Sequence, residues 1–178
     1  MSKIDTLCVQ AGYEPKNGEP RVVPIVQSTT YAYDTASGLA DLFDLKADGY
    51  FYTRLANPTV SALENKLTAL DGGVCAIACA SGMSATLLAV LNVCNAGDNI
   101  VSANAIYGGT YNLFSITLKK YGIECRFFDP DASSEEIEAL VDEKTKVIFA
   151  ETLANPTIVV LDFDKISAIA KKHKVLFM

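Results

Sequence analysis

The residues Ala80-Ser81-Gly82-Met83 follow an apolar run and precede a helix-forming segment, an arrangement that suits the binding of a phosphate group. A strand that turns directly into a helix points several backbone N–H groups at one place, where the helix dipole favours an anion. Gly82 lets such an anion approach the backbone, because it has no side chain. An ordinary strand-to-helix turn capped by Ser81 fits the same residues, and the motif alone leaves both interpretations open. The sequence has no GxGxxG and no GxxxxGK(S/T) motif, so it does not favour a dinucleotide or P-loop site.

Two further segments carry side chains suited to a planar ligand that bears a phosphate. In Tyr107-Gly108-Gly109-Thr110, paired glycines free the backbone beside Tyr107, whose ring can then lie flat on such a ligand. A turn with a packed tyrosine is the alternative. Tyr52 and Arg54 lie on one side of an extended segment, where a hydroxyl and a guanidinium suit a phosphate; a surface arginine is the alternative.

Polar residues also close an apolar run at residues 151–157. In open α/β sheets, ligands bind at the carboxyl ends of the strands. Ser81, Tyr107 and Glu151 all fall at or just beyond such ends. We therefore expect them to converge on one pocket.

The elements that would position these residues alternate from about residue 74 onward. Near-continuous apolar strands joined by helices indicate an α/β fold with a mainly parallel sheet covered on both faces. The expected strands are residues 74–79, 99–103, 124–129, 146–151 and 175–178. The expected helices are residues 83–94, 110–121, a helix opening at Ser133 with a capping box to Glu136, and residues 164–174.

The two ends of the chain differ from this pattern. Residues 1–56 show weak periodicity and are interpreted as an extended arm that lies on another part of the molecule or on a partner subunit. Asn57 and Pro58 then begin a helix, as its N-cap and first residue. The chain ends on four apolar residues that are typical of a central strand, so we expect a fragment or a truncated product.

Composition excludes several classes of function. The net charge of −6 and a pI near 4.7 argue against nucleic acid as a partner. The sequence has neither a signal peptide nor an apolar run of about 20 residues, so we expect a cytoplasmic protein with no membrane partner.

The five cysteines are odd in number and embedded in apolar runs, and His173 is the only histidine. Core thiols are therefore expected, rather than disulfides or a metal site.

Taken together, four segments resemble the Cys/Met-metabolism family of pyridoxal-phosphate-dependent enzymes in their residues, order and separation. These segments are residues 52–59, 81–83, 107–110 and 151–157. Residues 42–46 and 107–114 are most similar to the O-acetylhomoserine sulfhydrylases of this family. The resemblance implies a truncated fold-type-I pyridoxal-phosphate transferase large domain. It comprises an arm over residues 1–56 and an incomplete cofactor-binding domain over residues 57–178.

The resemblance also implies roles for individual residues. The implied cofactor-binding residues are Tyr52, Arg54, Ser81, Gly82, Met83, Tyr107, Glu151 and Asn155. Gly82 and Met83 would donate backbone N–H groups to the phosphate of pyridoxal 5′-phosphate. Tyr107 would stack on the pyridine ring and serve as the catalytic residue that assists proton transfer. Asn155 would contact the phenolic oxygen, with Glu151 in support.

The implied site is shared between subunits. Tyr52 and Arg54 would reach the phosphate of the neighbouring subunit's cofactor, which makes a homo-oligomer, either a dimer or a tetramer, the expected assembly. The implied reaction replaces the acetyl ester of O-acetylhomoserine with sulfide and gives homocysteine and acetate. Cystathionine γ-synthase or γ-lyase is the alternative within the family, although Gly109 stands where methionine γ-lyases commonly carry cysteine. A truncated, non-catalytic chain that acts in binding or subunit pairing is the alternative outside it.

Two expected catalytic groups are missing from the chain. The family's ring-nitrogen aspartate should follow directly after Met178, and its Schiff-base lysine lies further on, in a Ser-x-Thr-Lys setting. Lys146 follows a threonine but lacks the serine and sits at the start of a strand, so it is interpreted as solvated. We therefore expect this chain alone to be inactive.

Overall fold

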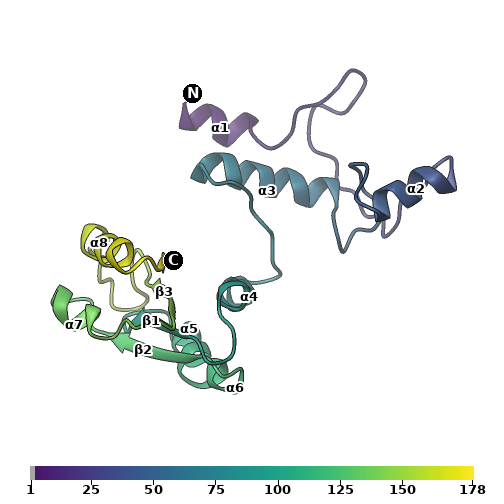
Figure 1. The fold of residues 1–178 in the computed structure, drawn as a ribbon. Coiled ribbons are helices and arrows are strands. Elements are labelled where there is room, and N and C mark those ends of the chain that lie inside the picture. The colour runs from purple at the N-terminus through teal and green to yellow at the C-terminus, as the bar shows by residue number, and fades with distance from the viewer. Residues whose placement is uncertain (1–2) are drawn as a thin grey trace. The chain divides into compact units, whose positions relative to one another are not determined.

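The computed structural model describes residues 3–178, which form two compact units. The first unit ends at Ala78, and the second comprises Cys79–Met178 (Figure 1). The second unit holds a four-stranded sheet and a continuous hydrophobic core. The boundary between the units lies inside the predicted 57–178 domain, whose extent as a functional domain stays a prediction.

The sheet of the second unit is parallel throughout, as the apolar runs predict. Its strands are β1 (Asn99–Ala103), β2 (Glu124–Phe128), β3 (Thr145–Phe149) and β4 (Leu176–Phe177), in the spatial order β2-β1-β3-β4. All five residues of β1 are buried, because this strand has a neighbour on each side and helices above and below it. In a parallel sheet, every connection runs from the carboxyl end of one strand to the amino end of the next. The loops that follow the strands therefore gather at one edge.

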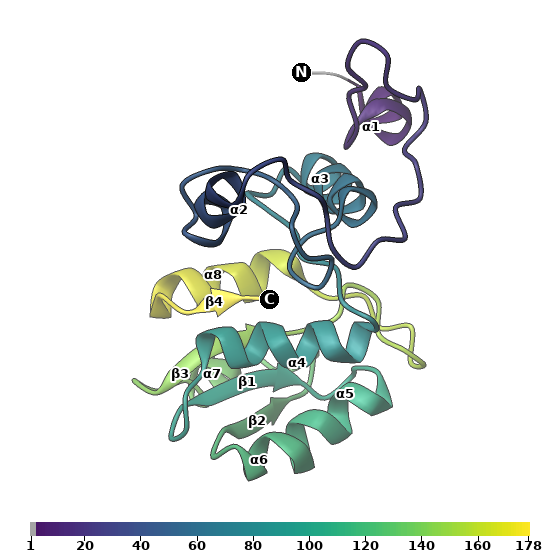
Figure 2. The same ribbon diagram turned by 90° about the vertical axis from the view of Figure 1, so that its right-hand side faces the viewer.

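Helices cover both faces of this sheet. They are α4 (Gly82–Val93), α5 (Gly108–Asn112), a π-helical turn η1 (Leu113–Thr117), α6 (Leu118–Lys120), α7 (Ser134–Glu138) and α8 (Phe163–His173). In Figure 1, α4, α5 and α6 lie on one side of the sheet, and α7 and α8 lie on the other; Figure 2 gives the view turned by 90°. The helices predicted at 83–94 and 164–174 are confirmed to within one residue at each end. The helix predicted at 110–121 instead begins at Gly108 and contains the π-helical turn.

The core between the sheet and its helices is apolar. Phe114 of η1 is fully buried and meets the ring of Phe149 in β3 edge-on, with ring centroids 4.9 Å apart and planes at 89°. On α8, Ile166 is also fully buried. Burying a side chain of this size stabilises a fold by about 1.5–3 kcal/mol. Hydrophobic contact, more than helix propensity, therefore fixes these helices to the sheet.

The prediction of a strand at residues 74–79 is wrong, because the structure has an irregular segment there. Val74 is 99% exposed and Ile77 is 82% exposed. Within the described part of the chain, no strand pairs with this segment. The N–H group of Ala78 instead donates a hydrogen bond to a side chain, Glu64 Oε1, at 2.8 Å. An apolar run becomes a strand only when a neighbouring strand accepts its hydrogen bonds, and no such neighbour is described here.

The first unit is more ordered than an extended arm. It contains α1 (Ile4–Gln10), α2 (Ala36–Phe43) and α3 (Pro58–Asp71), and α1 packs against α3. Two helices thus lie before residue 57, within the segment interpreted as an extended arm, whose role as an arm stays a prediction. Asn57 caps α3 as predicted, by accepting a hydrogen bond from the Thr59 N–H group at 2.9 Å. Its amide also donates to the Val26 carbonyl at 3.0 Å and to Thr53 Oγ1 at 3.1 Å, so this buried residue ties the loops before α3 to the helix.

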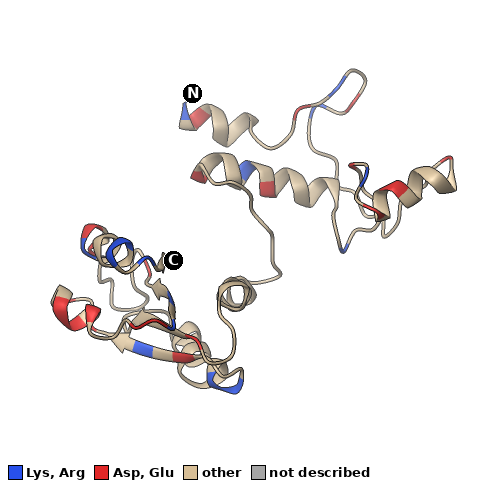
Figure 3. Ribbon diagram, in the orientation of Figure 1, with Lys and Arg blue, Asp and Glu red and all other residues tan. Residues whose placement is uncertain are grey.

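Acidic and basic residues are spread along the chain of both units (Figure 3). Lys171 and Lys172 lie in the last turn of α8, where cations suit the helix dipole, and Lys172 pairs with Glu138 of α7 at 2.7 Å. Within residues 3–178, no helix is both long and apolar enough to cross a membrane. Over the same residues, His, Cys, Asp and Glu side chains form no group that could hold a metal ion.

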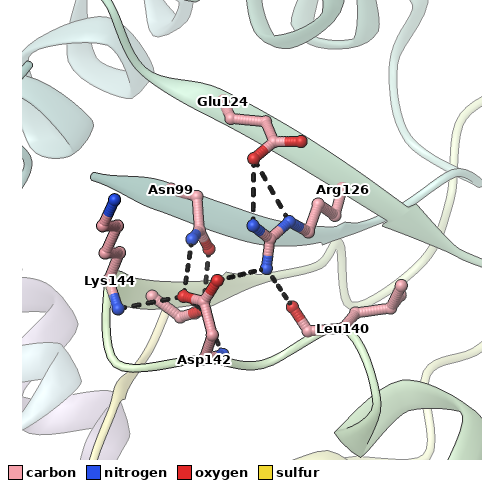
Figure 4. A network of polar contacts seen from close by, with 7 residues as sticks. Asn99, Glu124, Arg126, Leu140, Asp142 and Lys144 are labelled. Carbon is pink, nitrogen blue, oxygen red and sulfur yellow. Dashed lines mark hydrogen bonds and ion pairs between the residues drawn. The ribbon is translucent and has the colours of Figure 1, made fainter. Parts of the chain in front are cut away.

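A network of polar side chains closes the amino-terminal edge of the sheet (Figure 4). Asp142, in the loop before β3, accepts hydrogen bonds from Asn99 Nδ2 at 2.8 Å, from Arg126 Nη1 at 2.8 Å and from the Lys144 N–H group at 2.9 Å. The Thr145 hydroxyl donates to Asn99 Oδ1 at 2.7 Å. The hydrogen bond from Asn99, followed by that from Arg126, holds the pKa of Asp142 well below its usual range. This network joins the first residues of β1 and β3 to Arg126, the third residue of β2.

We expect Asp142→Asn to lower the free energy of unfolding by roughly 1–3 kcal/mol at pH 7, because Asn99 and Arg126 lose a charged acceptor. The folded-state pKa of Asp142 is depressed. Its contribution is therefore fully present above the unfolded-state pKa of about 3.9 and is lost as the pH falls toward the folded-state value. The difference between variant and wild type should shrink below about pH 4. Urea unfolding followed by circular dichroism at pH 7 and pH 3 measures it.

The matched control is Glu124→Gln, since Glu124 pairs with the same guanidinium, that of Arg126, at 3.0 Å but is 58% exposed. An exposed pair of this kind contributes about 0–1 kcal/mol. A loss from Glu124→Gln as large as that from Asp142→Asn, or a loss at Asp142 that does not change with pH, would contradict this account.

Candidate functional site

The first turn of α4 has two free backbone donors. Ser81 caps this helix: its Oγ accepts the Ser84 N–H group at 3.1 Å, and its carbonyl accepts the Ala85 N–H group at 3.0 Å. Among the described residues, the N–H groups of Gly82 and Met83 have no acceptor. A Cβ built on Gly82 would meet nothing within 4 Å, so the space beside the Gly82 Cα is open. Ser81 thus forms the ordinary cap that the sequence allows, and the turn still offers two donors to an anion.

Tyr107 lies directly before α5 and is fixed by its backbone. Its N–H group donates to Glu151 Oε1 at 2.9 Å, and its carbonyl accepts the Tyr111 N–H group at 2.9 Å, which begins the helix. The Tyr107 side chain is 49% exposed, so much of its ring is accessible.

Glu151, just beyond the end of β3, joins two loops. While its Oε1 accepts the Tyr107 N–H group, its Oε2 accepts the Asn155 N–H group at 3.4 Å. The loop that carries Asn155 is closed by hydrogen bonds, among them Ala154 N–H to the Val159 carbonyl at 2.9 Å. This closure leaves Asn155 exposed. One half-buried carboxylate thereby sets the distance between the start of α5 and the loop after β3.

The start of α4 and the start of α5 also touch. The hydroxyl of Thr110, in the first turn of α5, lies 3.9 Å from Met83 Sδ. Thr110 is buried, and its contact with the sulfur was not predicted, because nothing in the sequence shows which helices meet. The structure thus brings together Met83, Tyr107, Glu151 and Asn155 at the carboxyl edge of the sheet.

Tyr52 and Arg54 belong to the first unit. Tyr52 forms an isolated antiparallel bridge with Thr30, and the Arg54 guanidinium carbon lies 5.1 Å from the centroid of the Tyr52 ring. This cation–π contact holds the two side chains together. The segment is a turn rather than the extended segment predicted, because the N–H groups of Leu55 and Ala56 donate to the Tyr52 carbonyl. Their role toward the cofactor of a neighbouring subunit stays a prediction.

Lys146 is not at this site. It lies near the start of β3, whereas Glu151 lies beyond its end, and its amine is 3.5 Å from Asp98 Oδ1. With its side chain 39% exposed, Lys146 is a partly solvated, paired lysine.

The cysteines divide between core and surface. Burial raises the pKa of Cys94 to about 11 and that of Cys125 to about 12, so both stay protonated thiols at neutral pH. Cys8 and Cys75 are exposed, which corrects the expectation that all five are core thiols. The Cys75 error follows from the missing strand at residues 74–79, and Cys8 lies on α1, a helix that was not predicted.

The comparisons with known proteins agree with one another. The family model described as Cys/Met metabolism PLP-dependent enzyme matches residues 5–178. A homocysteine/cysteine synthase from Kluyveromyces lactis is 46% identical over 176 residues, which are 98% of this chain and 39% of that protein. O-acetyl-L-homoserine sulfhydrylase 1 from Thermus thermophilus is 44% identical over 177 residues, 97% of this chain and 41% of that protein. The chain thus spans about two fifths of the length of the curated relatives it matches.

Solved structures give the same result. A candidate O-acetylhomoserine (thiol)-lyase from Campylobacter jejuni, solved with N′-pyridoxyl-lysine-5′-monophosphate, superposes with a TM-score of 0.92 at 41% identity, over 99% of this chain and 43% of that one. A cystathionine γ-lyase from Lactobacillus plantarum superposes with a TM-score of 0.86 at 29% identity, over 99% of this chain and 44% of that one.

We expect Glu151→Gln to loosen both loops, because a neutral amide offers one acceptor oxygen in place of two charged ones. Hydrogen bonds to a charged acceptor contribute about 1.5–3 kcal/mol, so exchange of the Tyr107 amide should speed up roughly tenfold or more. Hydrogen exchange followed by NMR measures the Tyr107 and Asn155 amides separately.

Glu135→Gln is the control for the lost charge, since Glu135 is exposed on α7. It should leave exchange at Tyr107 and Asn155 unchanged. If Glu151→Gln also leaves both amides at wild-type rates, Glu151 does not join the two loops.

Proposed function

The chain belongs to the Cys/Met metabolism pyridoxal-phosphate-dependent enzymes, and from this premise we propose that it is the phosphate-binding part of an O-acetylhomoserine sulfhydrylase. The proposed reaction replaces the acetyl ester of O-acetylhomoserine with sulfide, which gives homocysteine and acetate. One observation carries the proposal: the free N–H groups at the start of α4 lie on the same sheet edge as Tyr107 and the Glu151–Asn155 contact.

The residues at this edge fit pyridoxal 5′-phosphate. The N–H groups of Gly82 and Met83 suit its phosphate, because they are free donors at the positive end of a twelve-residue helix. The half-exposed ring of Tyr107 suits the face of a planar ring. The exposed side-chain amide of Asn155 suits a phenolic oxygen.

Each residue then has a physical task. When bound, the cofactor supplies an electron sink for the amino-acid substrate. Gly82 and Met83 hold its phosphate, Tyr107 covers its ring and moves a proton through its hydroxyl, and Asn155 donates to its phenolic oxygen. Glu151 keeps Tyr107 and Asn155 at a fixed separation through their backbone N–H groups. Ser81 serves this site by capping α4, which leaves the next two N–H groups free.

The chain is proposed to hold the cofactor without a covalent bond. Lys146, the lysine whose sequence most resembles a Schiff-base lysine, pairs with Asp98 near the start of β3 rather than facing the site. The proposed whole enzyme takes its lysine, its ring-nitrogen aspartate and its substrate-carboxylate site from sequence beyond Met178. The chain alone is therefore proposed to be inactive. Its non-catalytic role would be to bind the ligand or to pair with another subunit.

Within the family, relative identities favour the sulfhydrylase activity over the alternatives. The homocysteine synthase and the sulfhydrylase are 46% and 44% identical to this chain, whereas the γ-lyase structure is 29% identical. Cystathionine γ-synthase or γ-lyase activity remains the second candidate. We further propose a cytoplasmic homo-oligomer in which Tyr52 and Arg54 complete the partner's phosphate site.

The proposal predicts binding that depends on the phosphate and not on the aldehyde. Pyridoxine 5′-phosphate, which has no aldehyde, should bind the chain about as tightly as pyridoxal 5′-phosphate. Pyridoxine without its phosphate should bind at least tenfold more weakly, because a charge-assisted hydrogen bond contributes about 1.5–3 kcal/mol. Isothermal titration calorimetry measures all three affinities.

Gly82→Pro and Gly82→Ala form a matched pair for this experiment. Proline removes the N–H donor but is tolerated at the first position of a helix, and Ser81 already has the extended conformation that precedes proline. Alanine keeps the donor, and its Cβ meets nothing within 4 Å. Gly82→Pro should weaken pyridoxine 5′-phosphate binding tenfold or more relative to Gly82→Ala. Equal affinities for the two variants, or tight binding of phosphate-free pyridoxine, would contradict the proposed cradle.

A further inference from the structure

The glycine at position 109 is explained by the space around it and not by its backbone. Gly109 is the second residue of α5, where glycine is less favourable than alanine by roughly 0.5–1 kcal/mol. It has no positive φ angle that would require glycine. A Cβ on Gly109, however, would lie 2.5 Å from Cε1 and 3.2 Å from Cδ1 of the Tyr107 ring. Side-chain carbons do not approach so closely, so the Tyr107 ring occupies the place that a side chain at position 109 would need.

Met83 lies against the same point. The Cβ built on Gly109 would be 3.3 Å from Met83 Sδ, and the hydroxyl of Thr110 touches that sulfur from the next residue of α5. The ring of Tyr107 and the sulfur of Met83 thus both lie within 3.3 Å of the place that a Cβ on Gly109 would take. The neighbouring Gly108 differs, since a Cβ there would meet nothing within 4 Å.

We propose that Gly109 is a positioning residue that sets where the Tyr107 ring lies relative to the first turn of α4. The inference rests on the proposed function, in which Tyr107 covers the cofactor ring and α4 holds its phosphate. The Tyr107 backbone is already held by Glu151, so a side chain at position 109 is accommodated most directly by a shift of the flexible Tyr107 ring. Such a shift changes the position of the ring relative to Met83 and to the phosphate donors.

The proposal predicts that Gly109→Ala separates ring binding from phosphate binding. Affinity for pyridoxine 5′-phosphate should fall about tenfold, because the ring of the ligand loses its stacking partner. Affinity for inorganic phosphate should stay within twofold of wild type, because the N–H groups of Gly82 and Met83 are untouched. Gly108→Ala is the matched control: it makes the same chemical change in the same helical turn, and it should leave both affinities within twofold.

A structural readout accompanies the affinities. In wild type and Gly108→Ala, NMR should show nuclear Overhauser contacts from the Tyr107 ring to the Gly109 α-protons and to the Met83 methyl group. In Gly109→Ala, the contact to Met83 should be lost. In a Tyr107→Ala background, Gly109→Ala should have no further effect on affinity, since the ring it would displace is gone.

The outcomes separate this inference from the proposed function. If wild type does not bind pyridoxine 5′-phosphate, the proposed function fails, and the Tyr107 contacts still decide the role of Gly109. If wild type binds but Gly109→Ala keeps the Met83 contact and matches Gly108→Ala in affinity, the positioning role is overturned. Should Gly109→Ala fail to fold, a folded Tyr107→Ala/Gly109→Ala double variant supports the clash, and an unfolded one overturns it.

Discussion

Parallel pairing of β1 with the strands on either side of it determines where the loops that carry the candidate site residues gather. Because β2, β1, β3 and β4 all run in one direction, each loop that leaves a strand emerges at the same edge. The Tyr107 turn follows β1, and Glu151 follows β3, so two segments 44 residues apart meet through one hydrogen bond. An antiparallel arrangement would have sent these loops to opposite edges. The remaining features of the site refine a position that the sheet has already fixed.

The two edges of the sheet use polar groups in opposite ways. At the amino edge, Asp142 accepts hydrogen bonds from Asn99, Arg126 and Lys144, so its charge is satisfied within the fold. At the carboxyl edge, Gly82 and Met83 keep N–H groups with no acceptor among the described residues. Gly82 is exposed and Met83 is half-buried, so water can pair with these N–H groups and they stay available to a ligand. The amino edge therefore stabilises the sheet, while the carboxyl edge is suited to bind an anion.

The sequence predicts the structure most reliably where interactions between neighbouring residues decide the local structure. The strand at 99–103 has the predicted bounds. The capping box between Ser133 and Glu136 is present, since its two hydrogen bonds are made within four residues. The predicted edge also gathers Tyr107 and Glu151, which follows from strand direction alone. The roles of these site residues toward a cofactor stay predictions.

The sequence-based predictions were wrong where contacts between residues far apart in the sequence decide the structure. Residues 74–79 have the composition of a strand, but a strand needs a neighbour, and the described chain supplies none. In the sequence, Gly109 looks only like an unfavourable helix residue, whereas in the structure the Tyr107 ring stands where its Cβ would be. The central claim, that the start of α4 holds a phosphate, is tested most directly by a ¹H–¹⁵N NMR titration of the chain with pyridoxine 5′-phosphate. The account predicts that the amide signals of Gly82 and Met83 move first and furthest; saturable shifts confined to other amides, or none at all, would contradict it.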